Sequence, residues 1–328
     1  MNSRRVLVVG GAGYVGSQLV KKMVAEGIPT RVLDTFWFGD HVLRDIHPLE
    51  FIKGDVRDLD SVRQSLIGVD TVIHLACISN DPSFDLNPSL GKSVNLDSFL
   101  PFLLECKKFG VRKIIYASSS SVYGIKQEKQ VTEELILEPL TDYSKYKAEC
   151  ERILLNEDLG DMVKCIVRPA TICGFSPRQR FDLVVNILTA SALTRGYIMV
   201  MGGDQYRPNL HIDDMVDCYI ALLSSRDSEI NYQVFNVGGD NLTLNQIAQN
   251  VRNVINTDLP IELKDTDDFR SYRIDSTKIK DCIGFSPRRT VQDAVTDLVQ
   301  KYHANAFDDN LFGSSYINIK KMHELSLG

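Results

Sequence analysis

The pair of side chains with the clearest chemical potential in the sequence is Tyr143 and Lys147. On a helix, positions i and i+4 lie on one face. An ammonium group beside a phenol lowers the pKa of the phenol, so this pair favours a phenolate at Tyr143 that acts as a base near neutral pH. The same spacing also occurs by accident on solvated helix faces, and this alternative stays open here.

A run of serines, from Ser118 to Ser121, stands at the end of an apolar, β-branched segment. If that segment is a parallel strand, its carboxyl end lies at the edge where open α/β sheets bind ligands. A hydroxyl group there can orient a substrate oxygen. The alternative is a polar turn, and it describes two of the four serines.

A glycine-rich segment closes the first apolar run, with Gly10, Gly13 and Gly16 around Tyr14 and Val15. Glycines at this spacing let the backbone approach a pyrophosphate at a helix N-terminus, where free N–H groups and the helix dipole favour anions. Between a strand and a helix, the spacing predicts a dinucleotide site. A tight packing turn without a ligand is the alternative.

Asp34 is the last residue of the second apolar run. A carboxylate at this place accepts hydrogen bonds from ribose hydroxyl groups and repels a phosphate. No lysine or arginine follows directly in 35–38. The sequence therefore predicts NAD rather than NADP as the cofactor; the alternative is a solvated carboxylate at a strand end.

These side chains need a scaffold, and the hydrophobic pattern indicates one. Short apolar runs alternate with stretches of helical periodicity near 14–26, 58–67, 92–109 and 143–159, which favours βαβ units in a doubly wound, Rossmann-type α/β fold. The apolar runs span 5–10, 30–34, 50–54, 70–76, 112–118, 163–168 and 233–237.

After about residue 170 the alternation loosens into loops. We therefore expect a dinucleotide-binding domain over 1–170, to which 210–238 adds back, and a smaller, interleaved lobe over 171–328. The last residues, from His303, are expected to lie over the surface or to be partly ordered. Asp213 and Asp214 are expected to charge or cap the start of a helix.

Composition excludes several classes of protein. The 328 residues carry a formal charge of −6, which is the wrong sign for neutralising a nucleic-acid backbone. No apolar stretch reaches the ~18 residues of a membrane span. Seven cysteines without a Cys-x-x-Cys pair favour reduced thiols in the cytoplasm over disulfides or a zinc site, so no metal is predicted.

Together these motifs resemble those of the extended short-chain dehydrogenases/reductases, in the nucleotide-sugar epimerase/dehydratase family. The resemblance runs from about residue 4 to about residue 300. Besides the glycines, Asp34, the serines and the Tyr–Lys pair, the motifs that carry it lie at 54–58, 74–76, 122–124, 168–169, 207–208, 211–214 and 235–238.

The resemblance implies roles for further residues. Ser119, Tyr143 and Lys147 would be the catalytic residues. The cofactor would contact Gly10, Gly13, Tyr14, Val15, Gly16, Asp34, Asp55, Val56, Leu75, Ala76, Asn95, Ser118, Tyr143, Lys147, Pro169 and Ala170.

For the substrate, the resemblance implies a nucleoside-diphosphate sugar. Arg207 and Arg270 would clamp the diphosphate, since a bidentate guanidinium suits that anion. Such local positive charge is required because the net charge is negative. The other substrate residues would be Ser79, Ser119, Tyr143, Thr171, Arg178 and Arg180, although solvated loop arginines are an equal alternative for the last two.

The family's shared first step is oxidation of the sugar to a 4-keto sugar. Ser120 and Ser121 stand where members that eliminate water or decarboxylate carry an acid. We therefore expect a 4-epimerase. The alternatives are a 4-dehydrogenase/reductase, then a 4,6-dehydratase, and outside enzymes an NAD-sensing or scaffold protein.

The resemblance also bears on partners and pathway. Loop 78–82 is similar to one in proteins that act on GDP-linked sugars in surface-polysaccharide biosynthesis, so GDP is as good an expectation as UDP. The family further suggests a homodimer or a higher homo-oligomer that packs through 92–109 and 143–159. An apolar stripe that begins at Leu96 fits this interface, and packing inside one subunit explains it equally well.

Overall fold

The computed structural model describes residues 5–266 and 271–327. Within these residues, a central sheet of seven parallel strands follows the order β10-β6-β5-β4-β1-β2-β3. All seven predicted apolar runs form these strands, and the predicted fold class is confirmed. Their bounds are Arg5–Val9 (β1), Thr30–Asp34 (β2), Glu50–Lys53 (β3), Val69–His74 (β4), Lys113–Ala117 (β5), Val163–Pro169 (β6) and Gln233–Val237 (β10).

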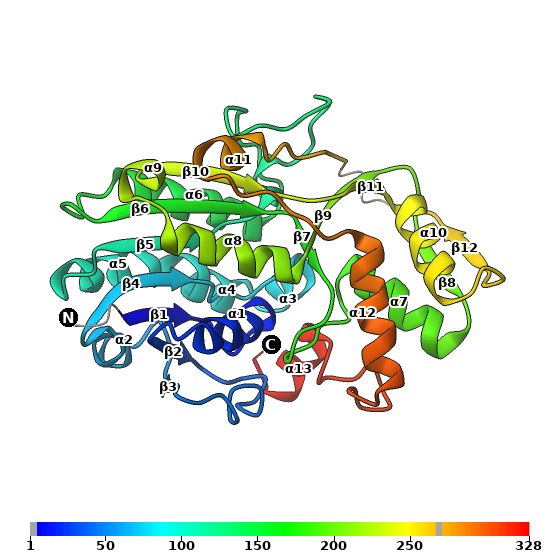
Figure 1. Cartoon of the computed structure of the whole chain (residues 1–328), viewed down its shortest axis with the longest axis horizontal. Coiled ribbons are helices and arrows are strands. Elements are labelled where there is room, and N and C mark those ends of the chain that lie inside the picture. The colour runs from blue at the N-terminus through cyan, green and yellow to red at the C-terminus, as the bar shows by residue number, and fades with distance from the viewer. Residues whose placement is uncertain (1–4, 267–270, 328) are drawn as a thin grey trace.

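Helices cover both faces of the sheet, as the nearly continuous apolar strands require. Along β1, Val6 and Val8 belong to one hydrophobic cluster, whereas Leu7 and Val9 belong to the other. Helices α1 (Tyr14–Ala25) and α8 (Ile212–Ser224) pack on the first side (Figure 1). The second side holds α2 (Leu59–Leu66), α5 (Phe99–Lys108) and α6 (Asp142–Asn156).

Short elements connect β4 to α5 and β5 to α6. After β4 come α3 (Asp81–Leu86), α4 (Pro88–Lys92) and the π-helix η1 (Ser93–Asp97). The 3₁₀ helix η2 (Ser120–Tyr123) follows β5. Both connections leave the carboxyl edge of the sheet, so their residues are placed for ligand binding.

A smaller group of elements lies beside this edge (Figure 1). It has a three-stranded sheet, a two-stranded sheet and its own hydrophobic cluster within the described residues. Its elements are β7 (Thr171–Cys173), α7 (Val184–Arg195), β8 (Ile198–Met201), β9 (Tyr206–His211), β11 (Asn241–Thr243), α10 (Leu244–Ile255), β12 (Ile261–Lys264) and α12 (Val291–His303). Helices α9 (Asp227–Ile230) and α11 (Thr277–Ile283) flank β10. The division into two domains at residue 170 stays a prediction.

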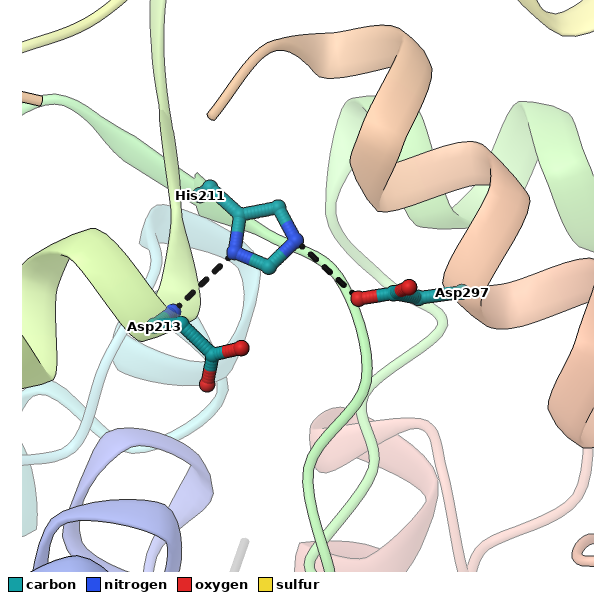
Figure 2. Close-up of side chains that lie close together, drawn as sticks. All are labelled: His211, Asp213 and Asp297. Carbon is teal, nitrogen blue, oxygen red and sulfur yellow. Dashed lines mark hydrogen bonds and ion pairs between the residues drawn. The ribbon is translucent and has the colours of Figure 1, made fainter. Parts of the chain in front are cut away.

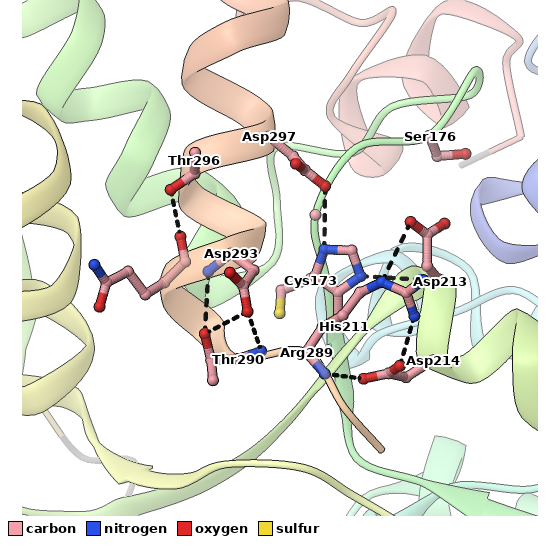
Figure 3. A network of polar contacts seen from close by, with 12 residues as sticks. Cys173, Ser176, His211, Asp213, Asp214, Arg289, Thr290, Asp293, Thr296 and Asp297 are labelled. Atoms are coloured by element: carbon pink, nitrogen blue, oxygen red, sulfur yellow. Dashed lines mark hydrogen bonds and ion pairs between the residues drawn. The ribbon is translucent and has the colours of Figure 1, made fainter. Parts of the chain in front are cut away.

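At the end of β9, His211 joins the two groups of elements. Its Nδ1 accepts a hydrogen bond of 3.1 Å from the backbone N–H of Asp213, and its Nε2 lies 3.2 Å from a carboxylate oxygen of Asp297 on α12 (Figure 2). Asp214 accepts a hydrogen bond of 2.7 Å from the Arg289 guanidinium (Figure 3). Asp213 and Asp214 lie in the first turn of α8, as expected from the sequence.

The C-terminal segment differs from the surface tail that we expected. Helix α13 (Asn318–Glu324) returns to the carboxyl edge of the sheet (Figure 1). Before it, Leu311, Tyr316 and Ile317 are buried in a cluster with Phe181. Burying these large apolar side chains favours docking over exposure to water. None of the helices in the described residues has the length and apolar character of a membrane span.

Candidate active site

A cavity of about 430 Å³ opens at the carboxyl ends of β1, β4, β5 and β6. It brings together most of the predicted site residues: Gly10, Gly13, Tyr14, Val15, Gly16, Asp34, Asp55, Val56, Leu75, Ala76, Ser79, Ser118, Ser119, Tyr143, Pro169, Ala170, Thr171, Arg178, Arg180 and Arg207. Among the described residues, Lys147 and Asn95 are not part of this lining and lie behind it. Arg270 lies outside the described residues.

The glycine-rich loop needs glycine for steric reasons. Gly10 has a φ of +82°, and a Cβ there would lie 2.7 Å from the backbone nitrogen of Ala76. A Cβ on Gly16 would lie 2.3 Å from the carbonyl oxygen of Gly10. The loop is therefore pressed against β4 and the start of α1, and no side chain caps the first N–H groups of α1. Uncapped N–H groups at a helix N-terminus suit a phosphate.

Asp34 stands at one end of the cavity. Its carboxylate accepts hydrogen bonds of 2.9 Å from the backbone N–H of Ala12 and 2.8 Å from that of Phe36. Burial raises the pKa of Asp34, and these backbone bonds act in the opposite direction. The carboxylate is thus held in one orientation, with lone pairs left for the hydroxyl groups of a ribose.

Asn95 acts through the loop that follows β4. Its side-chain oxygen accepts a hydrogen bond of 2.8 Å from the N–H of Ile78, and its amide group donates one of 2.9 Å to the carbonyl of the same residue. Ile78 lies in the stretch that lines the cavity from Leu75 to Asn80. Asn95 therefore fixes the backbone of this lining, and its contact with the cofactor stays a prediction.

Tyr143 lies at the start of α6, and it lines the cavity together with Ser119. Burial raises the pKa of Tyr143, and the neighbouring Cys77 and Asp81 raise it further, whereas Arg180 and the side chain of Ser119 lower it. Burial is the largest of these influences, so the net shift of the pKa is upward.

Lys147 follows on the same face of α6, as predicted, but its ammonium group is bound elsewhere. It donates a hydrogen bond of 2.6 Å to the carbonyl of Ala117 and lies 5.9 Å from the centre of the Tyr143 ring. The expectation that Lys147 lowers the pKa of the phenol stays a prediction.

Ser118 is held by a buried polar network. Its hydroxyl donates to Glu151, which forms a 2.6 Å ion pair with Arg168, and Arg168 donates 2.7 Å to the hydroxyl of Tyr123. Glu151 and Arg168 are buried. A satisfied buried network fixes geometry, so this one positions the end of β5, where Ser119 begins η2.

The cavity also extends to the smaller group of elements. Arg207 on β9 and Tyr272 both line it, and the Tyr272 hydroxyl lies 3.2 Å from that of Ser120. Arg178 and Arg180 line another side and are buried, so the alternative of solvated loop arginines is excluded. The side that faces the sheet thus carries hydroxyl groups, and the opposite side carries guanidinium groups.

Comparison with known proteins identifies the family. The model of the NAD dependent epimerase/dehydratase family matches residues 6–238. The chain belongs to this family. Its members are enzymes of the short-chain dehydrogenase/reductase type, and their cofactor is NAD, as the sequence predicts.

Similar proteins cover nearly the whole chain. UDP-glucose 4-epimerase of Lactobacillus helveticus is 27% identical over 320 residues, which cover 91% of this chain and 97% of that protein. UDP-glucuronic acid decarboxylase 2 of Arabidopsis thaliana is 29% identical over 327 residues, with 95% and 71% covered.

Two solved structures share the fold. UDP-glucose 4-epimerase of Thermotoga maritima with UDP-glucose has a TM-score of 0.83 and 24% identity, covering 92% of this chain and 100% of that chain. MoeE5 in complex with UDP-glucuronic acid and NAD has a TM-score of 0.81 and 26% identity, covering 92% and 99%.

The cavity fits the family's cofactor. Gly16 lets the start of α1 lie directly against the backbone of Gly10 and Gly11, the N-terminus of α1 offers uncapped N–H groups, and Asp34 lies at the ribose end. In addition, Arg178 and Arg180 each have a buried N–H group without a hydrogen-bond partner among the described residues. Such groups are costly unless an acceptor reaches them, and a pyrophosphate supplies acceptors.

Sequence reasoning missed several residues of the lining. Trp37 and Phe38 follow β2, Cys77 follows β4, and Asn318 and Met322 come from α13. The position after a parallel strand is a signal that could have found the first three. Nothing in the local sequence marks the last two, because only the tertiary fold brings α13 to the cavity.

His211, Asp213 and Asp297 are the group of side chains close enough to hold a metal ion among residues 5–266 and 271–327. Both ring nitrogens already face a partner: Nδ1 accepts the N–H of Asp213, and Nε2 faces Asp297 (Figure 2). A neutral imidazole that accepts at Nδ1 carries its proton at Nε2. The ring therefore offers no free lone pair, and the cluster joins α8 to α12.

Proposed function

We propose that the protein is an NAD-dependent nucleotide-sugar 4-epimerase that works through a transient 4-keto sugar. The observation that carries the proposal is that Ser119 and Tyr143 line one cavity, together with Ser120 and Ser121 in place of an acid. The similar proteins named as 4-epimerases support the same reaction.

The side chains have separate tasks in this reaction. Bound NAD supplies the hydride acceptor and donor. The phenolate oxygen of Tyr143 takes the proton of the sugar's 4-hydroxyl group and later returns it. The Ser119 hydroxyl orients the sugar oxygen, and Lys147 holds the backbone of Ala117 at the end of β5.

The substrate would occupy the side of the cavity that faces β9. Arg207 supplies a guanidinium for the diphosphate. Thr171 and Ser79 would contact the nucleotide sugar, and Arg270 stays a prediction. The identity of the base also stays open between UDP and GDP, as expected from loop 78–82.

The decisive experiment incubates the protein and NAD with UDP-, GDP-, CDP- and dTDP-sugars in deuterated water, followed by NMR of the products. A 4-epimerase returns an isomer without solvent deuterium, because the same hydride goes back to C4. Deuterium at C5 or C6 would show a dehydratase, for which Asp81 and Cys77 beside Tyr143 are the nearest groups. A released ketone with reduced cofactor would show the 4-dehydrogenase.

Tyr143→Phe tests the assigned base. Removing the phenolic oxygen should lower turnover by about 10²–10⁴-fold, the usual contribution of a general base. NAD binding, measured by calorimetry, should persist, since it depends on the glycine-rich loop and Asp34. Unchanged turnover would refute the mechanism. Bound NAD with no turnover on any sugar, in either form, would favour the sensor alternative.

The assembly and its setting are part of the proposal. A homodimer through α5 and α6 is supported by Leu104 and Phe109, which are exposed on and just after α5, whereas Phe99 and Leu103 are buried inside the subunit. Sedimentation at micromolar concentration should give twice the chain mass; a monomer would contradict it. We also propose that the protein is located in the cytoplasm and acts in polysaccharide biosynthesis.

A further inference from the structure

Arg178 and Arg180 form a positively charged corner of the cavity. Only 4% of Arg178 and 7% of Arg180 is exposed. The Nε of Arg178 and one terminal nitrogen of Arg180 have no hydrogen-bond partner among the described residues. Buried N–H donors of a charged group are costly when left unpaired. The corner therefore has the chemistry of a binding site for an anion.

Part of this charge is compensated within the protein. Arg180 donates 2.8 Å to Asp182, whereas the Arg178 guanidinium lies 3.8 Å from the centre of the Phe38 ring and donates to the side chain of Asn318. Burial, followed by the charge of Arg180, lowers the pKa of Arg178, and Asp182 and Asp34 act in the opposite direction. An anion between the two guanidinium groups would stabilise both.

Helix α13 holds the corner together. The Asn318 side chain accepts from Arg178 and donates 3.2 Å to the hydroxyl of Ser79, which also accepts 3.0 Å from Arg180. The backbone N–H of Asn318 donates 3.0 Å to Asp182. Asn318 thus ties the loop of the two arginines to the loop after β4. It lies outside the part of the chain that the family model matches.

The position of the corner indicates which anion it meets. The loop 176–180 lies on the first turn of α1: Ser176 donates 2.6 Å to the carbonyl of Tyr14, and the N–H of Arg178 donates 3.3 Å to Ser17. The ring under Arg178 belongs to Phe38, which follows β2 and Asp34. The arginines therefore lie beside the start of α1 and line the same cavity as the glycine-rich loop, where the pyrophosphate of NAD is expected, whereas the substrate's Arg207 comes from β9.

We propose that Arg178 and Arg180, positioned by Asn318, bind the pyrophosphate of the cofactor together with the glycine-rich loop. This departs from the sequence-based assignment of both arginines to the substrate. The inference depends on the NAD cofactor of the proposed function but not on the reaction at the sugar. Both NAD and the nucleotide-sugar substrate contain a diphosphate, so the substrate is the alternative ligand of this corner.

The test measures binding without turnover, by calorimetry on the full chain. The probes are NAD, ADP-ribose, adenosine, UDP and GDP. Arg178→Met and Arg180→Met should each raise the Kd for NAD and ADP-ribose by about 10- to 100-fold, the value of a charged hydrogen bond. The Kd for adenosine should change by less than about 2-fold, because adenosine lacks the pyrophosphate.

Asn318→Ala tests the positioning. It should raise the Kd for NAD and ADP-ribose by about 3- to 10-fold and spare adenosine, since the hydrogen bonds of the Asn318 side chain to Arg178 and Ser79 are lost. Lys320→Ala is the matched control on α13, because its exposed side chain donates to the carbonyl of Phe312. If Asn318→Ala also raised the Kd for adenosine, the cavity would be loosened in general, and this result would contradict a positioning role.

Two results would overturn the inference. If the arginine variants weaken UDP or GDP but not ADP-ribose, the corner belongs to the substrate's diphosphate. If no diphosphate is weakened while circular dichroism shows folded variants, the corner is not an anion site. Neither result affects the proposed epimerase reaction, which the product NMR tests separately.

Discussion

Burial is the largest influence on the phenol of Tyr143, and it raises the pKa. Arg180 is the cation that acts against it, together with the side chain of Ser119. A guanidinium stabilises a nearby phenolate, so the base that we propose depends on a residue that the sequence places among the substrate contacts. If Arg180 also binds the cofactor, as we propose, it links cofactor binding to the ionisation of the base.

Arg180→Met should shift the pH dependence of turnover. Without the guanidinium the pKa of Tyr143 rises further, so the phenolate forms only at higher pH and the acid limb of kcat/KM moves to higher pH. Measurement at saturating NAD separates this shift from weaker cofactor binding. Arg178→Met is the control, since Arg178 is not among the main influences on Tyr143. An unmoved limb in Arg180→Met would contradict the prediction.

Glu151 makes the buried ion pair with Arg168 behind Ser118. Glu151→Ala should lower the free energy of unfolding by about 3–5 kcal/mol, because it leaves a buried guanidinium without its partner. Urea unfolding measures the change. Glu149→Ala on the same helix, in an exposed pair with Arg152, should cost less than about 1 kcal/mol. If both variants lost the same free energy of unfolding, burial of the ion pair would not determine its contribution to stability.

Individual side chains were predictable where a motif marks them. Tyr143, Ser119 and the glycines carry their chemistry in local spacing, and the structure brings them to one cavity. The pKa of Tyr143 was not predictable, because it depends on Cys77, Asp81 and Arg180, which come from other segments. The hydrogen bond of Lys147 was not predictable either, because its acceptor, the carbonyl of Ala117, lies in another segment.

Among the elements, the turn from β1 into α1 has the strictest steric requirement. Gly16→Ala should cost about 1–3 kcal/mol of stability, since the new Cβ meets backbone atoms of Gly10 and Gly11 that cannot rotate away. It should also abolish measurable NAD binding, because α1 must move from the loop. Calorimetry and thermal unfolding check both effects.

Gly27→Ala is the matched control for that variant. Gly27 follows α1 with a φ of +72° and open space around it. The substitution should cost about 1–2 kcal/mol through its backbone conformation alone and leave the Kd for NAD unchanged. If Gly16→Ala also retained full NAD affinity, the glycine-rich loop would not be the pyrophosphate site.

Element boundaries followed the hydrophobic pattern closely, with one informative exception. The predicted helix over 92–109 is interrupted by the π-helix η1, where Asn95 turns its amide group to the backbone of Ile78. Periodicity cannot reveal this, because the distortion serves a contact with another segment. At the edge of the sheet, β3 is mostly exposed, unlike the buried strands of the interior.

At the scale of the whole molecule, the sheet was predictable and the closure of the cavity was not. Seven apolar runs alternate with helices, and this pattern permits few topologies. Asn318 and Met322 have no comparable signal: they reach the cavity because Leu311, Tyr316 and Ile317 dock beside Phe181. Contacts between segments so distant in sequence arise only in the folded chain.

The arrangement of α1 and α13 around one cavity has a consequence for the response of the chain to its ligand. A dinucleotide held by the glycine-rich loop and by the arginines that Asn318 positions would act as a noncovalent cross-link between helices near opposite ends of the chain. Local opening of α13 would then cost about 2.7 kcal/mol more at an NAD concentration 100-fold above the Kd.

Hydrogen exchange can measure this effect. NAD should slow exchange of the α13 amides, and ADP-ribose should do the same, whereas in Arg178→Met the protection should fall at equal ligand concentration. Exchange in α10, which lies in another cluster, is the internal control. If NAD left α13 unprotected, the two helices would be uncoupled. If NAD protects the α13 amides, their exchange rates measure the fraction of the protein that carries the cofactor.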